Sequence, residues 1–522
     1  MEIERPPQAS SSRHGMVATQ HHVATDAGEA MLRSGGNAVD AAVAAAFTLG
    51  VVEPAASGLG GQTVMLLHLD ENKRKFCLDG GSRAPHRTPP GELNREEQLR
   101  GHKASTVPST PAVLAWALQR YGSKSLEEVL EPAIEAAAAG YRVSLLQHQL
   151  AGRELGHLKE FPGGKLFLEG GERPYAAGSV FRQPALAGCL RRLSEAGIED
   201  FYQGDIARLI HQDMVANDGL IRDDDLAQIP WPVERNPLAA RHGSHRVLTF
   251  GPPGAGRALV EALNLLEQFP AAMRDPDSPE GALLLTHVIL KANLDRSDRP
   301  EDPALYAEEL ERGEAITRPD YARWAAGRIR SRIRTQGETT HLSVMDKAGN
   351  AVALTQSIER VYGSFSASPK LGFLYNNYMS AFEYRDIRHP YYLRPGANPW
   401  TSVAPTIVYK GPRPWLALGS PGSERIVSAI LQVLLRLELG SSPFEAVAAP
   451  RLHCSIRGKV SLEASRMHEE IPRRLQEHGF DIDERQPYSF YLGCVQLVQR
   501  ENDEFLGVSD PRRDGSARGP DA

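Results

Sequence analysis

The sequence has few cysteines, no excess of positive charge and no long apolar run. Its four cysteines, Cys77, Cys189, Cys454 and Cys494, are far apart and form no Cys-x-x-Cys pair. This spacing argues against a structural zinc site or a thiol redox motif. The net charge of −6 offers no basic surface to phosphates, so nucleic acid is a poor candidate partner.

The first residues contain no apolar segment of the kind that forms a secretory signal. The most apolar early stretch, 38–52, is too short to span a bilayer and includes Asp40. We therefore expect no membrane association and a cytoplasmic location, with a secreted chain that has lost its signal as the alternative. The 522 residues are 41% hydrophobic and 24% charged, which is typical of a folded enzyme and excludes a disordered chain.

Hydrophobic periodicity predicts an α+β protein. A helix is expected after the candidate caps Thr25 and Asp26, ending at Gly35-Gly36, and residues 105–330 are expected to be mostly helical. Alternation in 339–345 and 351–357 around a turn at 346–350 predicts a β-hairpin. The other predicted elements are helices at 38–49, 126–139, 183–196, 206–216, 258–268, 282–293 and 426–437, and strands at 16–19, 63–70, 403–409, 415–418, 495–499 and 505–508.

Two glycine-rich motifs lack the residues that their chemistry needs. Residues 251–256 have the glycine spacing of a phosphate loop but not its lysine and Ser/Thr. Residues 418–422 resemble a nucleophile elbow, but Leu418 replaces the first glycine. A nucleotide-binding protein and a serine hydrolase therefore remain weak alternatives.

The segment Glu338-Thr339-Thr340-His341 begins a predicted strand. A threonine hydroxyl is a poor nucleophile until its own α-amino group is freed to act as a base, which requires cleavage of the preceding peptide bond. Threonine also favours strands for purely structural reasons. The predicted hairpin places Ser357 or Ile358 across from Thr339 and Thr340, where a hydroxyl would support the nucleophile.

Several motifs occur together in one order along residues 15–519. They are 15–19, 35–43, Val52-Glu53-Pro54, 57–61, 131–136, 201–204, Thr339-Thr340-His341, 346–350 and 419–422. In this the chain resembles the γ-glutamyltranspeptidase (glutathione hydrolase) family of N-terminal-nucleophile hydrolases, and in particular its divergent acylase and oxamate amidohydrolase branch.

The resemblance implies a four-layer αββα sandwich and self-cleavage between Glu338 and Thr339. The products would be a large chain, 1–338, and a small chain, 339–522, intertwined in one catalytic domain as a heterodimer that itself could dimerise. The family chemistry implies a small-molecule amide substrate and neither metal nor organic cofactor. A non-catalytic member that binds a ligand is the alternative.

The resemblance also implies residue roles. Thr339 is the expected nucleophile, Ser357 its supporting hydroxyl, and Gly422 and Ser423 the oxyanion hole, through their backbone N–H groups. Thr401 and Ser402 correspond to a serine pair that binds the substrate carboxylate. The further candidate substrate-binding residues are Asn377, Tyr378, Glu359, Arg360 and Arg83.

Three positions depart from the family pattern. Gly81 replaces the arginine that binds the α-carboxylate, Ala381 replaces the aspartate that binds the α-amine, and Glu359 replaces an asparagine. Arg83 and Arg360 are candidate substitutes for the lost cation. The family default is a γ-glutamyl group of a glutathione-type substrate, and the alternative is a glutaryl-like or oxamate-like acyl amide.

Overall fold

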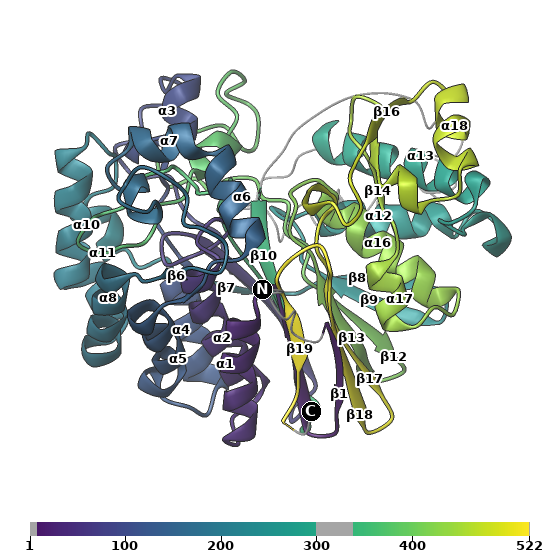
Figure 1. Cartoon of the computed structure of the whole chain (residues 1–522), viewed down its shortest axis with the longest axis horizontal. Helices are drawn as coiled ribbons and strands as arrows, with labels where there is room; N and C mark the ends of the chain where they lie inside the picture. Colours follow the sequence, from purple (N-terminus) through teal and green to yellow (C-terminus); the bar gives the residue numbers. More distant parts are fainter. Residues whose placement is uncertain (1–7, 299–337, 521–522) are drawn as a thin grey trace.

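The structure, a computed structural model, describes residues 8–298 and 338–520. Two β-sheets lie face to face in the middle of the molecule, and helices cover the outer face of each (Figure 1). This is the four-layer αββα sandwich that the family resemblance implied. None of the helices in the described ranges is both long enough and apolar enough to span a bilayer.

The first sheet is antiparallel throughout and contains the predicted hairpin at its centre. The sheet packs its inner face against the second sheet and its outer face against helices. Its strands, in spatial order, are β19 (Ser516–Arg518), β2 (Gly15–Thr19), β10 (Glu338–Asp346), β11 (Ala351–Glu359), β3 (Gln62–Leu69), β4 (Arg74–Gly80) and β7 (Val233–Arg235).

The second sheet is also antiparallel and likewise combines strands from both ends of the chain. Its order is β1 (Ala9–Ser12), β18 (Glu504–Ser509), β17 (Gln496–Glu501), β13 (Arg413–Gly419), β12 (Thr406–Lys410), β9 (His245–Thr249) and β8 (Leu238–His242). Two small sheets lie outside the sandwich, β14 (Leu452–Cys454) with β15 (Lys459–Leu462) and β16 (Asp481–Glu484), and β5 (Tyr141–Arg142) with β6 (Val180–Phe181).

Helix α2 (Ala38–Val52) is buried on every side, which accounts for its alanine- and valine-rich sequence. It packs on β10 and β11 and is covered in turn by α4 (Thr110–Tyr121) and α5 (Leu126–Ala139). Asn37 caps it by accepting from Val39 and Asp40. The other helices of this layer are α1 (His22–Arg33), α3 (Arg95–Leu99), α4 (Thr110–Tyr121), α5 (Leu126–Ala139), α6 (Leu145–Arg153), α7 (Leu155–Glu160), α8 (Pro184–Ala196), α9 (Glu199–Gln203), α10 (Asp205–Ala216) and α11 (Asp223–Ala227).

The opposite layer covers the second sheet. It contains α12 (Gly256–Leu266), α13 (Pro279–Asp298), α16 (Arg425–Glu438), α17 (Pro443–Ala448) and α18 (Glu470–Glu477). Their apolar faces form a separate core with β12, β13 and β17. The two sheets share a third, thinner core of their own.

Two sequence expectations were wrong in detail. Thr25 and Asp26 do not cap α1, because the chain turns directly after β2 and His21 caps the helix by accepting from the Val23 N–H. Thr25 instead hydrogen-bonds Thr19 inside the fold. The middle of the chain is not only helical, since it also supplies the edge strands β7 and β8 and their interior neighbour β9. Residues 299–330 of that region lie outside the described residues.

A buried ion network holds the last segment of the chain in place. Asp510 pairs with Arg451 at 2.6 Å and with Arg512 at 3.0 Å, and Arg512 also pairs with Glu463 at 2.7 Å. All four side chains are inaccessible to solvent. Burial opposes ionisation of Asp510, but Arg451 and Arg512 outweigh it and hold the pKa of that carboxyl below its usual range.

Replacing Asp510 with Asn should lower the free energy of unfolding by about 3–5 kcal/mol, because two buried guanidinium groups lose their shared anion. Since the folded-state pKa of Asp510 is depressed, its contribution is present above an ordinary aspartate pKa of about 4 and is lost as the pH falls below it. Denaturant unfolding at several pH values measures both effects. Asp224→Asn, in the exposed pair with Arg87, is the control and should cost less than about 1 kcal/mol.

Candidate functional site

The first residues of strand β10 have a neighbouring strand on one side only. The strand pairs with β11 from Glu338 onward but with β2 only from Leu342 onward. Its first residues therefore extend beyond β2 and have a strand on one side only. Thr339 lies in this extension and is 5% exposed.

A β-bulge sets Thr339 against two residues of β11. Glu338 pairs with Glu359 and Thr340 pairs with Gln356, so Ser357 and Ile358 together oppose Thr339. The predicted hairpin register is thus correct for Thr339 and wrong for Thr340, because the extra residue of β11 shifts the pairing.

Thr339 and Ser357 are on the faces of their strands that point to the second sheet. Along β10, His341 lies against Gly419 of β13, and alternation places Thr339 on the same face. Along β11, Ser357 follows Thr355, whose hydroxyl hydrogen-bonds His341 at 2.8 Å. Ser357 also accepts a hydrogen bond of 2.8 Å from the Glu359 N–H.

The hydroxyl of Tyr378 connects Ser357 with the Thr401 side chain. It forms side-chain hydrogen bonds with both, and with Gln62 of β3. Tyr378 opens a short 3-10 turn, Tyr378–Ala381, and its burial raises the pKa of its phenol, which stays protonated. A chain of hydroxyl groups thus runs from Ser357, which opposes Thr339 at the bulge, through Tyr378 to Thr401.

The loop between β13 and α16 presents Gly422 and Ser423 in the left-handed region, with φ of 116° and 54°. The N–H of Cys494 donates to Ser420 at 2.9 Å, which ties the loop to the residues before β17. The N-terminus of α16 follows directly, and its partial positive charge favours an anion nearby.

A cavity of about 280 Å³ opens beside this loop. Five of the residues proposed from sequence line it, namely Glu359, Arg360, Thr401, Ser402 and Ser423. Ala381, one of the three positions that depart from the resemblance, lines it too. The remaining wall comes from Arg95, Asn293, Arg296, Ser380, Phe382, Glu383, His389, Tyr391, Trp400, Glu424 and Ile456.

Arg83 and Asn377, two of the proposed substrate-binding residues, do not line the cavity. The backbone of Arg83 forms an isolated bridge with Val107. The Asn377 amide donates to the Leu99 carbonyl at 3.0 Å and accepts from the Arg360 N–H at 3.1 Å. Asn377 therefore holds the backbone that carries Arg360.

Arg296, near the end of α13, is a cation of the cavity that no sequence motif indicated. Its guanidinium donates to the Thr401 carbonyl at 2.6 Å and to the Ser402 hydroxyl at 3.4 Å, and it stacks 4.5 Å from the centre of the Trp400 ring. Burial lowers its pKa to about 10, so it remains charged at neutral pH. No carboxylate of the described chain forms an ion pair with it.

Glu359 is the matching anion. Burial raises its pKa to about 7, against the opposing influence of Arg360 and Arg296. Burial also lowers the pKa of Arg360, whose Nε is enclosed without a hydrogen-bond partner among the described residues. The cavity therefore contains buried charged groups that form no ion pair with one another or with another described residue, as expected of a site that binds a charged ligand.

The family model for gamma-glutamyltranspeptidase matches residues 24–519. The chain belongs to the gamma-glutamyltranspeptidase family. It is 32% identical to the glutathione hydrolase proenzyme of Escherichia coli K12, over 96% of this chain and 91% of that protein. It is 33% identical to the acylase ACY 1 proenzyme of Pseudomonas sp. SE83, over 86% of this chain and 84% of the relative.

The structure is also similar to that of the cephalosporin acylase from Bacillus halodurans, with a TM-score of 0.86 and 25% identity over 99% of this chain and 98% of the other. Membership of the gamma-glutamyltranspeptidase family and the αββα fold are thereby confirmed. Relatives that are named hydrolases and relatives that are named acylases are about equally similar, which supports amidohydrolase or acyltransferase chemistry and leaves the acyl group open.

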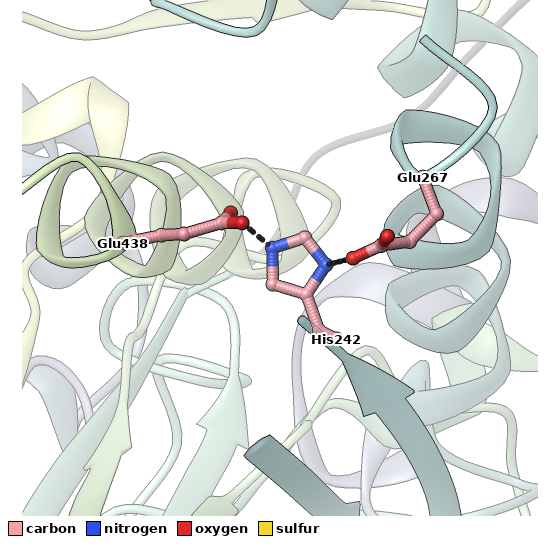
Figure 2. A group of neighbouring side chains, drawn as sticks. All are labelled: His242, Glu267 and Glu438. Atoms are coloured by element: carbon pink, nitrogen blue, oxygen red, sulfur yellow. Dashed lines mark ion pairs between the residues drawn. The ribbon is translucent and has the colours of Figure 1, made fainter. Parts of the chain in front are cut away.

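Among the described residues, one group of possible metal ligands lies at the end of α16 opposite the cavity. His242 lies between Glu267 and Glu438, 2.8 Å from each (Figure 2). The Arg274 guanidinium lies 3.3 Å from Glu438. Hydrogen bonding to His242 lowers the pKa of Glu438 despite partial burial. With both ring nitrogens paired and a guanidinium alongside, the group is an ion cluster that joins β8, α12 and α16.

Replacing Glu359 with Gln should stabilise the protein at pH 8 by about 1–3 kcal/mol. The raised folded-state pKa means that between about pH 4 and pH 7 the folded protein keeps a proton that the unfolded chain has released, so wild-type stability falls as the pH rises. The difference between variant and wild type should shrink towards pH 5 in denaturant unfolding. Glu135→Gln, at an exposed site, should show no such trend; a pH-independent difference at Glu359 would contradict the assignment.

Proposed function

We propose that the chain is a self-processing threonine amidohydrolase or acyltransferase whose nucleophile is Thr339. The observation that carries the proposal is the juxtaposition around the start of β10. Thr339 opposes Ser357, and the hydroxyl chain from Ser357 leads to Thr401 in a cavity that Ser423 also lines. Family membership supports the same reading.

Self-cleavage would begin with attack of the Thr339 hydroxyl oxygen on the Glu338 carbonyl carbon. The C–N bond breaks as the ester forms, and the amide nitrogen takes up a proton to become the α-amine. Water then hydrolyses the ester, leaving a carboxylate on Glu338 and restoring the Thr339 hydroxyl. The large chain would thus end at Glu338 and the small chain begin at Thr339.

Turnover would use the same hydroxyl on a substrate amide. The freed α-amine accepts the hydroxyl proton and later protonates the leaving amine, while the acyl group passes to Thr339. The N–H groups of Gly422 and Ser423 would stabilise the negative charge on the carbonyl oxygen. Water or a second amine then takes the acyl group from the ester.

The acyl group that fits this cavity best carries a carboxylate at its far end. Arg296 contacts both residues of the Thr401-Ser402 pair and supplies the cation that Gly81 does not. A second cation, Arg360, lines the same cavity, and Ala381 offers no charge for an ammonium group. A glutaryl-like dicarboxylic acyl amide satisfies these groups.

A γ-glutamyl group is the second candidate, and Glu359 is the observation that favours it. A γ-glutamyl group differs from a glutaryl group only by an α-ammonium, which ionised Glu359 would pair with. Because the pKa of Glu359 is raised to about 7, such pairing would strengthen as the pH rises through neutrality. Kinetics with γ-glutamyl and glutaryl derivatives of one amine, at pH 6 and pH 8, separate the two candidates.

Thr339→Ala should remain a single uncut chain, whereas wild type should give two fragments divided between Glu338 and Thr339. Intact-mass spectrometry of the two purified proteins measures this directly. Thr401→Ala is the matched control, since it removes a hydroxyl from the cavity wall and should leave cleavage intact. Fragments with the same boundary in Thr339→Ala would disprove the nucleophile.

Arg296→Gln should raise KM for an anilide of a carboxylate-ended acyl group about 100-fold, because the substrate carboxylate loses its charged partner. An otherwise equal anilide without the terminal carboxylate should be hydrolysed as by wild type. Arg83→Gln, outside the cavity, serves as the control arginine and should leave both KM values unchanged. Equal losses on both anilides with Arg296→Gln would show that Arg296 only supports the cavity wall.

A further inference from the structure

The face of β10 opposite Thr339 carries a buried polar cluster that the mechanism above does not use. Leu342 and Val344 of this face pack into the core under α2. Alternation places Thr340 on the same face, and its side chain is fully buried. Thr340 directly follows the proposed nucleophile Thr339 in the chain. A contact that restrains Thr340 therefore also restrains the backbone of Thr339.

The Thr340 hydroxyl contacts two oxygen atoms, a carboxylate oxygen of Glu53 and Oε1 of Gln20, the latter at 3.0 Å. A hydroxyl has one proton and cannot donate to both. The Gln20 Nε2 atom is buried without a partner among the described residues. Exchanging the amide oxygen and nitrogen resolves both facts, since Gln20 then donates to Thr340 and Thr340 donates to Glu53.

Glu53 is itself held from two sides. It ends the buried helix α2, and Arg513, from the segment before β19, pairs with it at 2.7 Å. Burial raises the pKa of Glu53, while Arg513 and the Thr340 hydrogen bond oppose that change. The adjoining cavity measures only about 20 Å³, room for about one water and no substrate.

We propose that Glu53 is a positioning residue that acts through Thr340 to place the Thr339 hydroxyl for self-cleavage and for turnover. The first residues of β10 lack β2 as a neighbour, so backbone pairing alone leaves one side of this stretch unheld. The Glu53–Thr340 hydrogen bond supplies the missing restraint from the helix layer. The inference rests on the proposed function, because it takes Thr339 as the nucleophile.

The test compares Thr340→Val, which keeps the shape and loses the hydroxyl, with Thr340→Ser, which keeps the hydroxyl. Displacing a reacting atom by about 1 Å costs on the order of 100-fold in rate. Thr340→Val should therefore lower the self-cleavage rate and kcat by about 10-fold to 100-fold, with KM within about 3-fold of wild type. Thr340→Ser should restore both rates.

Thermal unfolding of each variant separates positioning from folding. Wild-type rates in Thr340→Val would overturn the proposal, and so would a loss of rate that follows a loss of Tm and that Thr340→Ser does not rescue. Glu53→Gln, measured in the same way, should lower kcat with KM retained. If Glu53→Gln does not fold, the rates of the two Thr340 variants still test the proposal. Wild-type rates in Thr340→Val would not change the result expected for Thr339→Ala cleavage. The positioning role of Glu53 and the nucleophile role of Thr339 are therefore tested independently.

Discussion

The candidate site depends on keeping the first residues of β10, Thr339 among them, in register at a place where the strand has a neighbour on one side only. Hydrogen bonds to β11 run the whole length of β10, whereas those to β2 stop at Leu342. The bulge opposite Thr339 adds a local twist at that point. Helix α2 packs on one face of β10 and the second sheet packs on the other, and these contacts hold the strand in place.

The buried charges of the cavity favour binding of a charged ligand but lower the stability of the fold. Arg296 and Glu359 come from α13 and β11, elements of different layers, and within the described chain neither forms an ion pair. Burying such groups without partners costs free energy, which a ligand of complementary charge recovers. The Asp510 network shows the opposite case, since there every buried charge has its counter-charge within the fold. Among the described residues, buried charge without an ion-pair partner therefore distinguishes the candidate binding site from the structural ion network.

Local patterns in the sequence predicted most elements because each depends on nearby residues. Helix α5 matches its predicted bounds, and the β10–β11 hairpin follows from alternation around one turn. The short strands β7, β8 and β9 have too few residues for a clear period, and the capping role of His21 depends on where β2 ends. Arg296 and the Glu53–Thr340 contact join residues more than 100 positions apart. Only the folded chain brings such pairs together, so no motif indicated these contacts, although Glu53 and Thr340 each belong to one of the listed motifs.

The topology also bears on the proposed cut before Thr339. Each sheet contains strands that precede residue 338 and strands that follow it, and in the first sheet β10 and β11 lie between β2 and β3. Arg513 of the C-terminal segment pairs with Glu53 of α2 across the same division. A chain cut at this point would keep every interstrand hydrogen bond except those at the new ends. Cleavage would therefore free an α-amine at the nucleophile while the sheets, and not the peptide bond, hold the two chains together.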